Sequence, residues 1–378
     1  MRKVLALVGA VLVSLPLSLV TDAAKPHFAD PIRIGVFASL TGATSAYGIS
    51  SNNSFKLATE EVNKAGGING RQVELVSEDD HSNTEEVPGL VKKLINEDKV
   101  HALLAETIST RAMAAAPIAQ ANKVVMISPA AVKPELTMQG DYIFRACFIS
   151  SAEGEAIASF ARNKLNAKSA GVIWDANNDY AVVLGKFFME SFIKMGGQIL
   201  NQQTYEANDK DVSGQIRSIN GSKPDVIFAP GFSTTAPVIA GEVKRQHSKA
   251  VLIGSDGWDS PSLLDASAES FEGVYFANHF WVGSGEPLVK RFVAEYKSRY
   301  GVAPDAAAAT AYDAARLLFD AIRRARSTES TAIREALAKT ANFPGVTGRI
   351  TINEKRNANV PVYMLKIEKG KFSLQDQR

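Results

Sequence analysis

The residues best suited to chemistry stand where two apolar runs end. The run 124–127 stops at Ser128-Pro129 and leads into the small residues Ala130 and Ala131. The run 251–253 stops in the same way at Gly254-Ser255-Asp256-Gly257. Small side chains leave backbone N–H and C=O groups open to a ligand, and Asp256 adds a carboxylate. The chemistry that these residue types favour is noncovalent binding of a polar or charged group.

Both apolar runs have the pattern of strands in a parallel sheet. A continuous apolar run is typical of a strand that is buried on both faces, and Pro129 cannot continue a central strand. Open α/β sheets bind ligands in the crevice at the carboxyl ends of their strands. We therefore expect the two loops to face each other across one pocket. The alternative is that both are ordinary strand-to-helix turns.

Predicted strands and helices alternate along the chain, which favours an α/β fold with parallel sheets. The segment 32–37 predicts a strand, and 54–62 predicts a helix because its apolar residues recur at helical spacing. Gly66-Gly67 ends that helix in the manner of a glycine cap. The pattern restarts after residue 146, and period-two strands such as 349–352 follow near the end. The chain therefore predicts two α/β units.

The first residues predict an export signal and not a part of the fold. Two basic residues precede the apolar run 4–20, and Ala23-Ala24 follow it. A transmembrane anchor is the alternative, but the run is short for a span of about 20 residues. We expect a signal peptide over 1–24. Cys147 is the only cysteine, so we expect neither an internal disulfide nor a lipid anchor, which needs a cysteine at the cleavage site.

Composition and motifs argue against several classes of protein. Lys+Arg number 42 and Asp+Glu 40, so bulk charge indicates neither a nucleic-acid nor a membrane-surface partner. No nucleophile elbow, zinc-binding His-Glu-x-x-His or phosphate loop is present. The histidines lack metal-ligand spacing; they are His27, His81, His101, His247 and His279. We expect no enzyme activity, no catalytic residues, no metal and no cofactor.

Three motifs in order resemble the periplasmic leucine/isoleucine/valine-binding proteins of bacterial ABC transporters. The first is Ala65-Gly66-Gly67-Ile68-Asn69-Gly70 followed by Glu78-Asp79-Asp80. The second is Ile127-Ser128-Pro129-Ala130-Ala131 with Pro134-Glu135-Leu136-Thr137, and the third is Gly254-Ser255-Asp256-Gly257-Trp258. The match covers essentially the whole mature chain. It implies a type I periplasmic binding protein, in which two Rossmann-like lobes close over a ligand.

The resemblance also implies how the chain divides. Residues 30–148 plus 280–357 would form the N-terminal lobe, and 149–279 plus 358–378 the C-terminal lobe. Three crossing strands would join them, near 148–151, 277–281 and 357–361.

The resemblance assigns the carboxylate end of an amino acid ligand to the N-terminal lobe. Ser109 would hold the α-carboxylate with its hydroxyl; its alternative role is a helix N-cap. The neighbouring Ile108 is also expected to contact the ligand. Val132 would offer its N–H to the carboxylate, where the family usually has threonine, and Ala130 its carbonyl to the ammonium. Glu106 and Arg111 flank this loop as charges; a surface ion pair is the simpler interpretation, and contact with the ligand is the alternative.

The other ligand contacts fall mainly on the C-terminal lobe. Asp256 would pair with the ligand ammonium, with Gly254 and Gly257 leaving room for the ligand; the alternative is an ordinary turn aspartate. Aromatic walls are expected from Tyr47, Tyr180 and Phe232, the last in place of a frequent tyrosine. Trp258 is either another wall or core. Ala307 stands where the family often has tyrosine, so the ligand would gain space there.

The resemblance therefore predicts a solute-binding protein of the periplasm. It would capture a branched-chain, other apolar or aromatic amino acid and deliver it to the permease and ATPase subunits of an ABC transporter, acting as a monomer. The alternatives are a ligand sensor on the same fold and a receptor for a small carboxylate that lacks an ammonium group.

Overall fold

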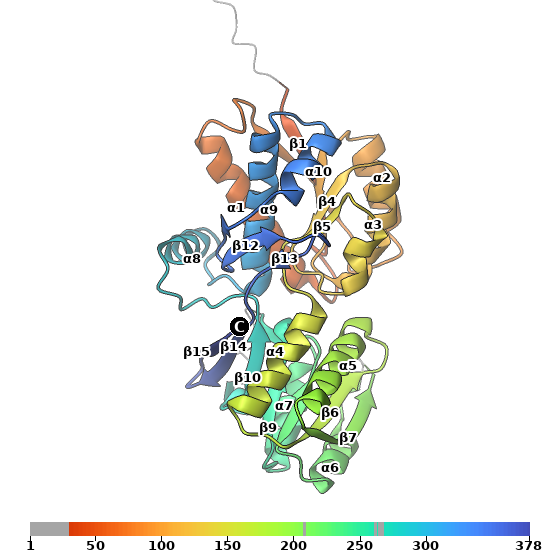
Figure 1. Ribbon diagram of the computed structural model, residues 1–378, viewed down its shortest axis with the longest axis vertical. Coiled ribbons are helices and arrows are strands. Elements are labelled where there is room, and N and C mark those ends of the chain that lie inside the picture. The colour runs from red at the N-terminus through yellow and green to blue at the C-terminus, as the bar shows by residue number, and fades with distance from the viewer. Residues whose placement is uncertain (1–29, 207–208, 261–262, 264–267) are drawn as a thin grey trace, which may run out of the picture.

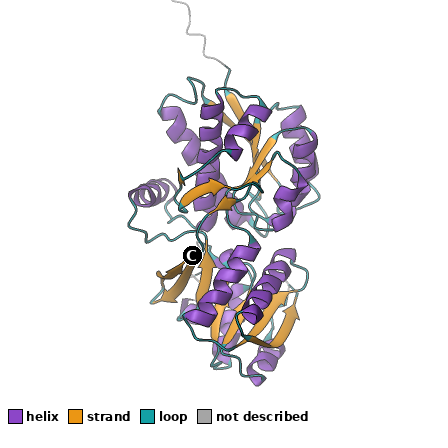
Figure 2. Cartoon of the chain, in the orientation of Figure 1, coloured by secondary structure: helices purple, strands orange, loops and turns teal. Residues whose placement is uncertain are grey.

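The computed structural model describes residues 30–206, 209–260, 263 and 268–378, which fold into two lobes stacked along the long axis (Figure 1). The signal peptide expected over 1–24 lies outside these described residues. In each lobe, helices cover a central sheet (Figure 2). The α/β class expected from the alternation of strands and helices is therefore confirmed.

The upper lobe in Figure 1 contains a parallel sheet in the order β2-β1-β3-β4-β5. Alternate residues of β1 enter different cores: Ile34 and Val36 pack with helices α1 and α9, and Phe37 packs with α2 and α3. A strand that is covered on both faces must be apolar on both faces, which explains the unbroken apolar runs. The strands are β1 (Ile32–Ala38), β2 (Val73–Asp79), β3 (Ala102–Leu104), β4 (Val125–Ser128) and β5 (Ile143–Arg145).

The lower lobe contains a sheet in the order β15-β14-β10-β9-β8-β6-β7. Strand β14 pairs antiparallel with β10 and with β15, whereas β6 to β10 pair in parallel. The strands are β6 (Ser169–Asp175), β7 (Gln198–Tyr205), β8 (Val226–Ala229), β9 (Val251–Gly254), β10 (Tyr275–Asn278), β14 (Tyr363–Glu368) and β15 (Lys371–Gln377).

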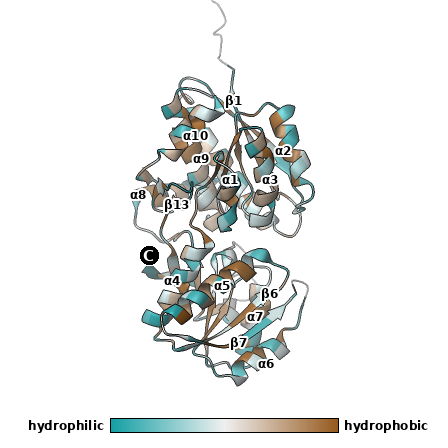
Figure 3. Ribbon diagram, turned by 45° about the vertical axis from the view of Figure 1, so that its right-hand side comes forward, coloured by the Kyte–Doolittle hydropathy of each residue, from teal (hydrophilic) through white to brown (hydrophobic). Residues whose placement is uncertain are grey.

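The helices divide between the lobes in the same way. Those of the upper lobe are α1 (Ser45–Lys64), α2 (Val87–Asn96), α3 (Ser109–Ala121), α8 (Pro287–Tyr300), α9 (Ala306–Ala325) and α10 (Ser330–Ala338). Those of the lower lobe are α4 (Ser150–Asn163), α5 (Asp179–Lys194), α6 (Ser213–Gly221) and α7 (Ala236–Arg245). Central strands are coloured mostly as hydrophobic in Figure 3, and outer loops mostly as hydrophilic. Within the described ranges, no helix has the length and apolar character needed to cross a bilayer.

Helix α1 begins earlier than the apolar spacing predicts, at Ser45 and not at Ser54. Its first turns are polar in sequence, yet Ser50 and Ser51 are buried. Ser50 donates to Asp305 at 2.9 Å, and Ser51 bonds the Thr107 hydroxyl at 2.8 Å. The expected end is confirmed: the helix stops at Lys64, and Gly66 follows in the left-handed region with φ +97°.

The chain passes between the lobes after β5, after β10 and after β13 (Figure 1). A small antiparallel sheet of β11 (Phe343–Pro344), β12 (Arg349–Ile352) and β13 (Ala358–Asn359) precedes the last passage. In the upper sheet β1 lies between β2 and β3, and in the lower sheet β6 lies between β7 and β8. Such switches in strand order open crevices at the carboxyl ends of the strands, which here face each other between the lobes.

Candidate functional site

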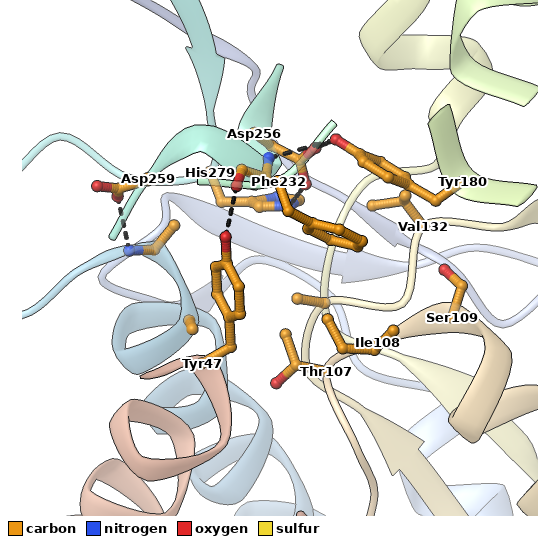
Figure 4. A pocket seen from close by; sticks show the side chains of 14 residues that line it. Tyr47, Thr107, Ile108, Ser109, Val132, Tyr180, Phe232, Asp256, Asp259 and His279 are labelled. Atoms are coloured by element: carbon orange, nitrogen blue, oxygen red, sulfur yellow. Dashed lines mark hydrogen bonds and ion pairs between the residues drawn. The ribbon is translucent and has the colours of Figure 1, made fainter. Parts of the chain in front are cut away.

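A cavity lies where the two lobes meet, with about 450 Å³ of space not filled by protein atoms. Loops from the carboxyl ends of strands in both lobes line it, together with the starts of α1, α3, α5 and α9 (Figure 4). The lining residues are Tyr47, Thr107, Ile108, Ser109, Ala130, Val132, Tyr180, Phe232, Asp256, Gly257, Asp259, His279, Ala306 and Ala307.

The upper wall of the cavity is formed by the start of α3 and by the loop after β4. Ser109 is the first residue of α3, and the N-cap is Ile108, which gives no side-chain cap. The alternative role of Ser109 as an N-cap is therefore wrong. Its hydroxyl accepts a long hydrogen bond of 3.4 Å from the Lys133 N–H and lines the cavity. Because free N–H groups and the helix dipole meet at a helix N-terminus, this wall favours an anion.

The charges near this wall form a buried network, so the expected surface pair of Glu106 and Arg111 is wrong. Glu106 is 1% exposed and Arg111 5%. Arg111 bonds Glu106 at 3.1 Å and lies 3.5 Å from Asp80. Glu106 also accepts from the Ser39 N–H at 3.2 Å. Burial raises the pKa of Glu106 against the opposing effect of Arg111. The network ties the loops after β1, β2 and β3 together and leaves no direct role at the ligand for these charges.

Asp256 forms the acidic centre of the lower wall. Its Oδ2 accepts from His279 Nε2 at 2.8 Å, and its Oδ1 accepts from the Tyr180 hydroxyl. Its N–H donates to Glu153 at 2.9 Å. Burial alone would raise the pKa of Asp256, but the hydrogen bonds from His279 and Tyr180 lower it. Burial and the Asp256 charge raise the pKa of Glu153 well above its usual value. The two shifts run in opposite directions, so the electrostatics favour the negative charge of the pair on Asp256 and a proton on Glu153.

Aromatic rings close the apolar side of the cavity. The Tyr47 and Phe232 rings lie 5.8 Å apart at 55°, and Tyr180 stacks on Phe232 at 5.2 Å. Ile108 and Ala307 pack in the same cluster. The small Ala307 side chain lines the cavity beside these rings.

Polar contacts across the cleft hold the lobes together in this conformation. The Tyr47 hydroxyl donates to the Gly257 carbonyl at 2.6 Å, and Lys133 pairs with Asp179 at 2.9 Å. Asp259 accepts from the first N–H of α9, that of Ala306, at 2.8 Å. These contacts join residues of different lobes, so the structure is that of a closed cleft.

The nine residues that the sequence assigned as ligand contacts all line this one cavity. They are Tyr47, Ile108, Ser109, Ala130, Val132, Tyr180, Phe232, Asp256 and Ala307. That each of them binds a ligand remains a prediction. Gly257, which was expected to leave room for the ligand, also lines the cavity. Sequence reasoning missed Thr107, Asp259, His279 and Ala306. Thr107 and Ala306 adjoin the predicted residues Ile108 and Ala307, but nothing in the sequence marked His279.

Two interpretations of the loop after β9 are corrected. Gly254 does not make room for a ligand, because a Cβ there would lie 2.4 Å from the ring of Trp258. Trp258 is fully buried, packs edge-on against Phe271 and does not line the cavity. It is a core residue. The glycine at 254 is needed so that this ring can fit under the loop.

Neither a group of metal-ligating side chains nor the thiol of Cys147 is found among the described residues that line the cavity. Across the part of the chain that the structure describes, no three His, Cys, Asp or Glu side chains group as metal ligands. Cys147 is fully buried, and burial raises the pKa of its thiol to about 12. A thiol that stays protonated is a poor nucleophile. What the site offers is hydrogen-bond donors for an anion, the carboxylates of Asp256 and Asp259, and aromatic walls.

A family model described as Periplasmic binding protein matches residues 31–371. Among known proteins, the Leu/Ile/Val-binding protein homolog 3 of Brucella melitensis is 24% identical over 352 residues. These cover 92% of this chain and 94% of the relative.

Solved structures agree with this match. The leucine-binding protein of Thermotoga maritima has a TM-score of 0.86 and 33% identity, covering 92% of this chain and 98% of its own. The branched-chain amino acid transporter substrate-binding protein of Streptococcus pneumoniae, solved in complex with isoleucine, has a TM-score of 0.85 and 31% identity. The coverage is 92% of this chain and 99% of that one.

Proposed function

Because the chain belongs to the periplasmic binding protein family, we propose that it captures an amino acid between its lobes and delivers it to an ABC permease. The observation that carries this proposal is the cavity between the lobes, where anion-binding groups face an acidic one across aromatic walls. An α-amino acid presents a carboxylate, an ammonium and a side chain, and these three features match the three surfaces. The ligand class is that of branched-chain or other apolar amino acids, aromatic ones included.

The carboxylate of the ligand would lie at the upper wall. Ser109 would donate its hydroxyl, and Val132 its N–H, in a region already favourable to anions because α3 begins there. Hydrogen bonds to an ionised group are roughly twice as strong as neutral ones. Valine at 132 supplies no hydroxyl, so its contribution would come from the backbone alone.

The ammonium would lie between the Ala130 carbonyl and Asp256. An ionised carboxylate in a nearly dry cavity needs a positive partner, because a buried unpaired charge is costly. The ligand ammonium would join His279 and Tyr180 around Asp256.

Closure would follow from the division of these contacts between the lobes. We propose the division 30–148 with 280–357 and 149–279 with 358–378. Only the closed form makes both sets of contacts, so a ligand shifts the population toward it. The permease, energised by its ATPase subunits, would then recognise the closed monomer. No turnover of the ligand is expected.

A carboxylate without an ammonium is a second candidate ligand. The observation in its favour is that both carboxylate oxygens of Asp256 already accept hydrogen bonds from the protein, at Tyr180 and at His279. In that case Asp256 would be only a structural part of the lower wall, and the groups of the upper wall would determine which ligands bind.

Calorimetric titration with three related ligands tests the proposal. L-leucine carries both charges, 4-methylpentanoate lacks the ammonium, and L-leucinamide lacks the carboxylate. The amino acid function predicts that leucine binds more tightly than either analogue. Tighter binding of 4-methylpentanoate would favour the second candidate. If no amino acid or carboxylate in a thermal-shift screen raises the melting temperature, the proposed function is wrong. A ligand at 100 times its dissociation constant should stabilise by roughly 2.7 kcal/mol.

Export to the periplasm has its own test. Intact-mass measurement of the protein from the periplasmic fraction should show the loss of about 22 to 29 residues. An uncut chain held in the inner membrane would contradict the predicted signal peptide.

A further inference from the structure

The carbonyl groups of residues 131–134, in the loop after β4, accept hydrogen bonds from within the protein. Arg145, on β5, donates to the Ala131 carbonyl at 2.9 Å and to the Lys133 carbonyl at 2.6 Å. A longer bond of 3.3 Å reaches the Pro134 carbonyl. The Val132 carbonyl accepts from the Ser150 N–H at 2.9 Å and from its hydroxyl at 3.1 Å. Two neighbouring segments therefore fix the orientation of this loop.

One peptide unit links Arg145 with the cavity. The carbonyl of Ala131 and the N–H of Val132 belong to the same peptide, and in a trans peptide they point in opposite directions. Because the carbonyl points to Arg145, the N–H points away from it, on the side where Val132 lines the cavity. Among the hydrogen bonds of the described residues, none uses the Val132 N–H. It is free for a ligand.

Arg145 is also unusual because its charge is buried without an ion-pair partner among the described residues. It is fully buried, and among the described residues it forms no ion pair. Burial lowers the pKa of Arg145 to about 10, so the group remains charged at neutral pH. Glu135, the one carboxylate that acts on the pKa of Arg145, is exposed. A buried cation whose partners are only carbonyl groups leaves a positive field in the loop that carries them.

We propose that Arg145 is a positioning residue for the ligand carboxylate, which acts through the Ala131–Val132 peptide. Arg145 sets the direction of the Val132 N–H and polarises this group. The reason is that hydrogen bonds linked through one peptide strengthen each other at low dielectric. The carboxylate thus benefits from a full positive charge without touching it. The inference rests on the proposed function, since it assigns the site for the carboxylate of that ligand.

The test compares a charged and an uncharged ligand in matched variants. Arg145→Met removes the charge, and Arg145→Lys keeps it without the planar fork. For Arg145→Met we expect the affinity for L-leucine to fall by about tenfold or more, while that for L-leucinamide changes by less than about threefold. Arg145→Lys should recover part of the difference. Equal losses for both ligands would mean that Arg145 only stabilises the loop, and would overturn the proposal.

Arg162→Met is the matched control. Arg162 also donates to backbone carbonyls, those of Ala167 and Met195, but lies in the lower lobe away from the cavity. Its loss should lower the melting temperature and leave the leucine-to-leucinamide ratio unchanged. If Arg162→Met changes this ratio as much as Arg145→Met does, the effect of Arg145 does not act through the Ala131–Val132 peptide, and the proposal is contradicted.

A second measurement needs no ligand and so separates this inference from the proposed function. In the amide NMR spectrum of the free protein, Arg145→Met should move the Val132 proton upfield, because its peptide loses the cation. Arg145→Lys should lie between the two. If Val132 keeps its resonance in both variants, the inference fails, whatever the ligand is. If wild type binds neither leucine nor its analogues, the proposed function fails, while the amide shift still decides the role of Arg145.

Discussion

The hydroxyl of Tyr47 in α1 donates a hydrogen bond of 2.6 Å to the carbonyl oxygen of Gly257, which lies 210 residues further along the chain. The same oxygen of Tyr47 accepts from the Ser233 N–H at 3.0 Å. Since Tyr47 belongs to the upper lobe and both partners to the lower one, these bonds exist only when the cleft is closed. Burial raises the pKa of Tyr47, so the hydroxyl stays protonated and able to donate.

Tyr47→Phe should therefore weaken ligand binding, although the aromatic ring stays in the cavity wall. A hydrogen bond contributes about 0.5–1.5 kcal/mol net, so the loss of these contacts should raise Kd by about tenfold. Small-angle scattering of the ligand-bound protein should show a larger open fraction. Tyr205→Phe is the control, because the Tyr205 hydroxyl bonds Thr235 within one lobe at 3.0 Å. If both variants bind equally well, the Tyr47 bridge does not contribute to closure.

Ser109→Ala should weaken binding of carboxylate ligands. The hydroxyl lines the cavity at the start of α3, and a hydrogen bond to a charged group contributes about 1.5–3 kcal/mol. Titration with L-leucine should give a Kd at least about tenfold higher. Thr110→Ala changes the next residue, whose side chain is exposed, and should bind as wild type does. Equal affinity of Ser109→Ala and wild type would remove Ser109 from the site.

Asp256→Asn should lower the affinity for amino acids by at least about thirtyfold, because removing one partner of a desolvated charge pair costs roughly 2–5 kcal/mol. The amide keeps the shape of the side chain. The ligand 4-methylpentanoate serves as the internal control, since it has no ammonium to lose. If binding of leucine is unchanged, the ammonium does not meet Asp256, and a carboxylate ligand becomes the better candidate.

Ala307→Tyr should discriminate between ligands by size. Ala307 is 4% exposed and lies in one cluster with Tyr47 and Ile108, so a ring there would occupy the space of a ligand side chain. Overfilling a packed site costs on the order of 1–3 kcal/mol. Titration should show a greater loss for leucine and phenylalanine than for alanine. A uniform loss for all three would mean that Ala307 does not limit the side-chain pocket.

Stability should depend on pH through Asp305, the N-cap of α9. Burial raises the pKa of Asp305 from 3.8 to about 7, and the charge of Asp259 from the other lobe adds to this effect. The folded protein thus holds a proton that the unfolded chain releases. This contribution to stability is present in full below about pH 4 and is lost as the pH rises through about 7.

Asp305→Asn cannot ionise, so its melting temperature should fall less between about pH 5 and pH 8 than that of wild type. Melting curves across this range measure the difference. Asp211→Asn is the control, because Asp211 is exposed and its pKa is lowered, so it does not titrate in this window. Parallel curves for wild type and Asp305→Asn would contradict the raised pKa.

The order of elements and most of the site could be read from the sequence. Strands covered on both faces need unbroken apolar runs, so β1, β4 and β9 were visible as such. Strand β7 was missed because its sequence, Gln198–Tyr205, is mostly polar. It lies at the edge of its sheet, where one side is free of a neighbouring strand. The first turns of α1 were missed because small polar residues, and not apolar ones, are buried there through hydrogen bonds.

The sequence by itself determined which residues stand at the ends of strands, because backbone accessibility there follows from small side chains and from proline. Tertiary structure alone decided what those residues contact. Glu106 and Arg111 look like surface charges in sequence, yet they are buried because Asp80 and Ser39 arrive from other strands to bind them. His279 has no distinguishing neighbours in sequence, but it reaches Asp256 because β9 and β10 pair side by side. Contacts between segments far apart depend on sheet order, which local patterns do not encode.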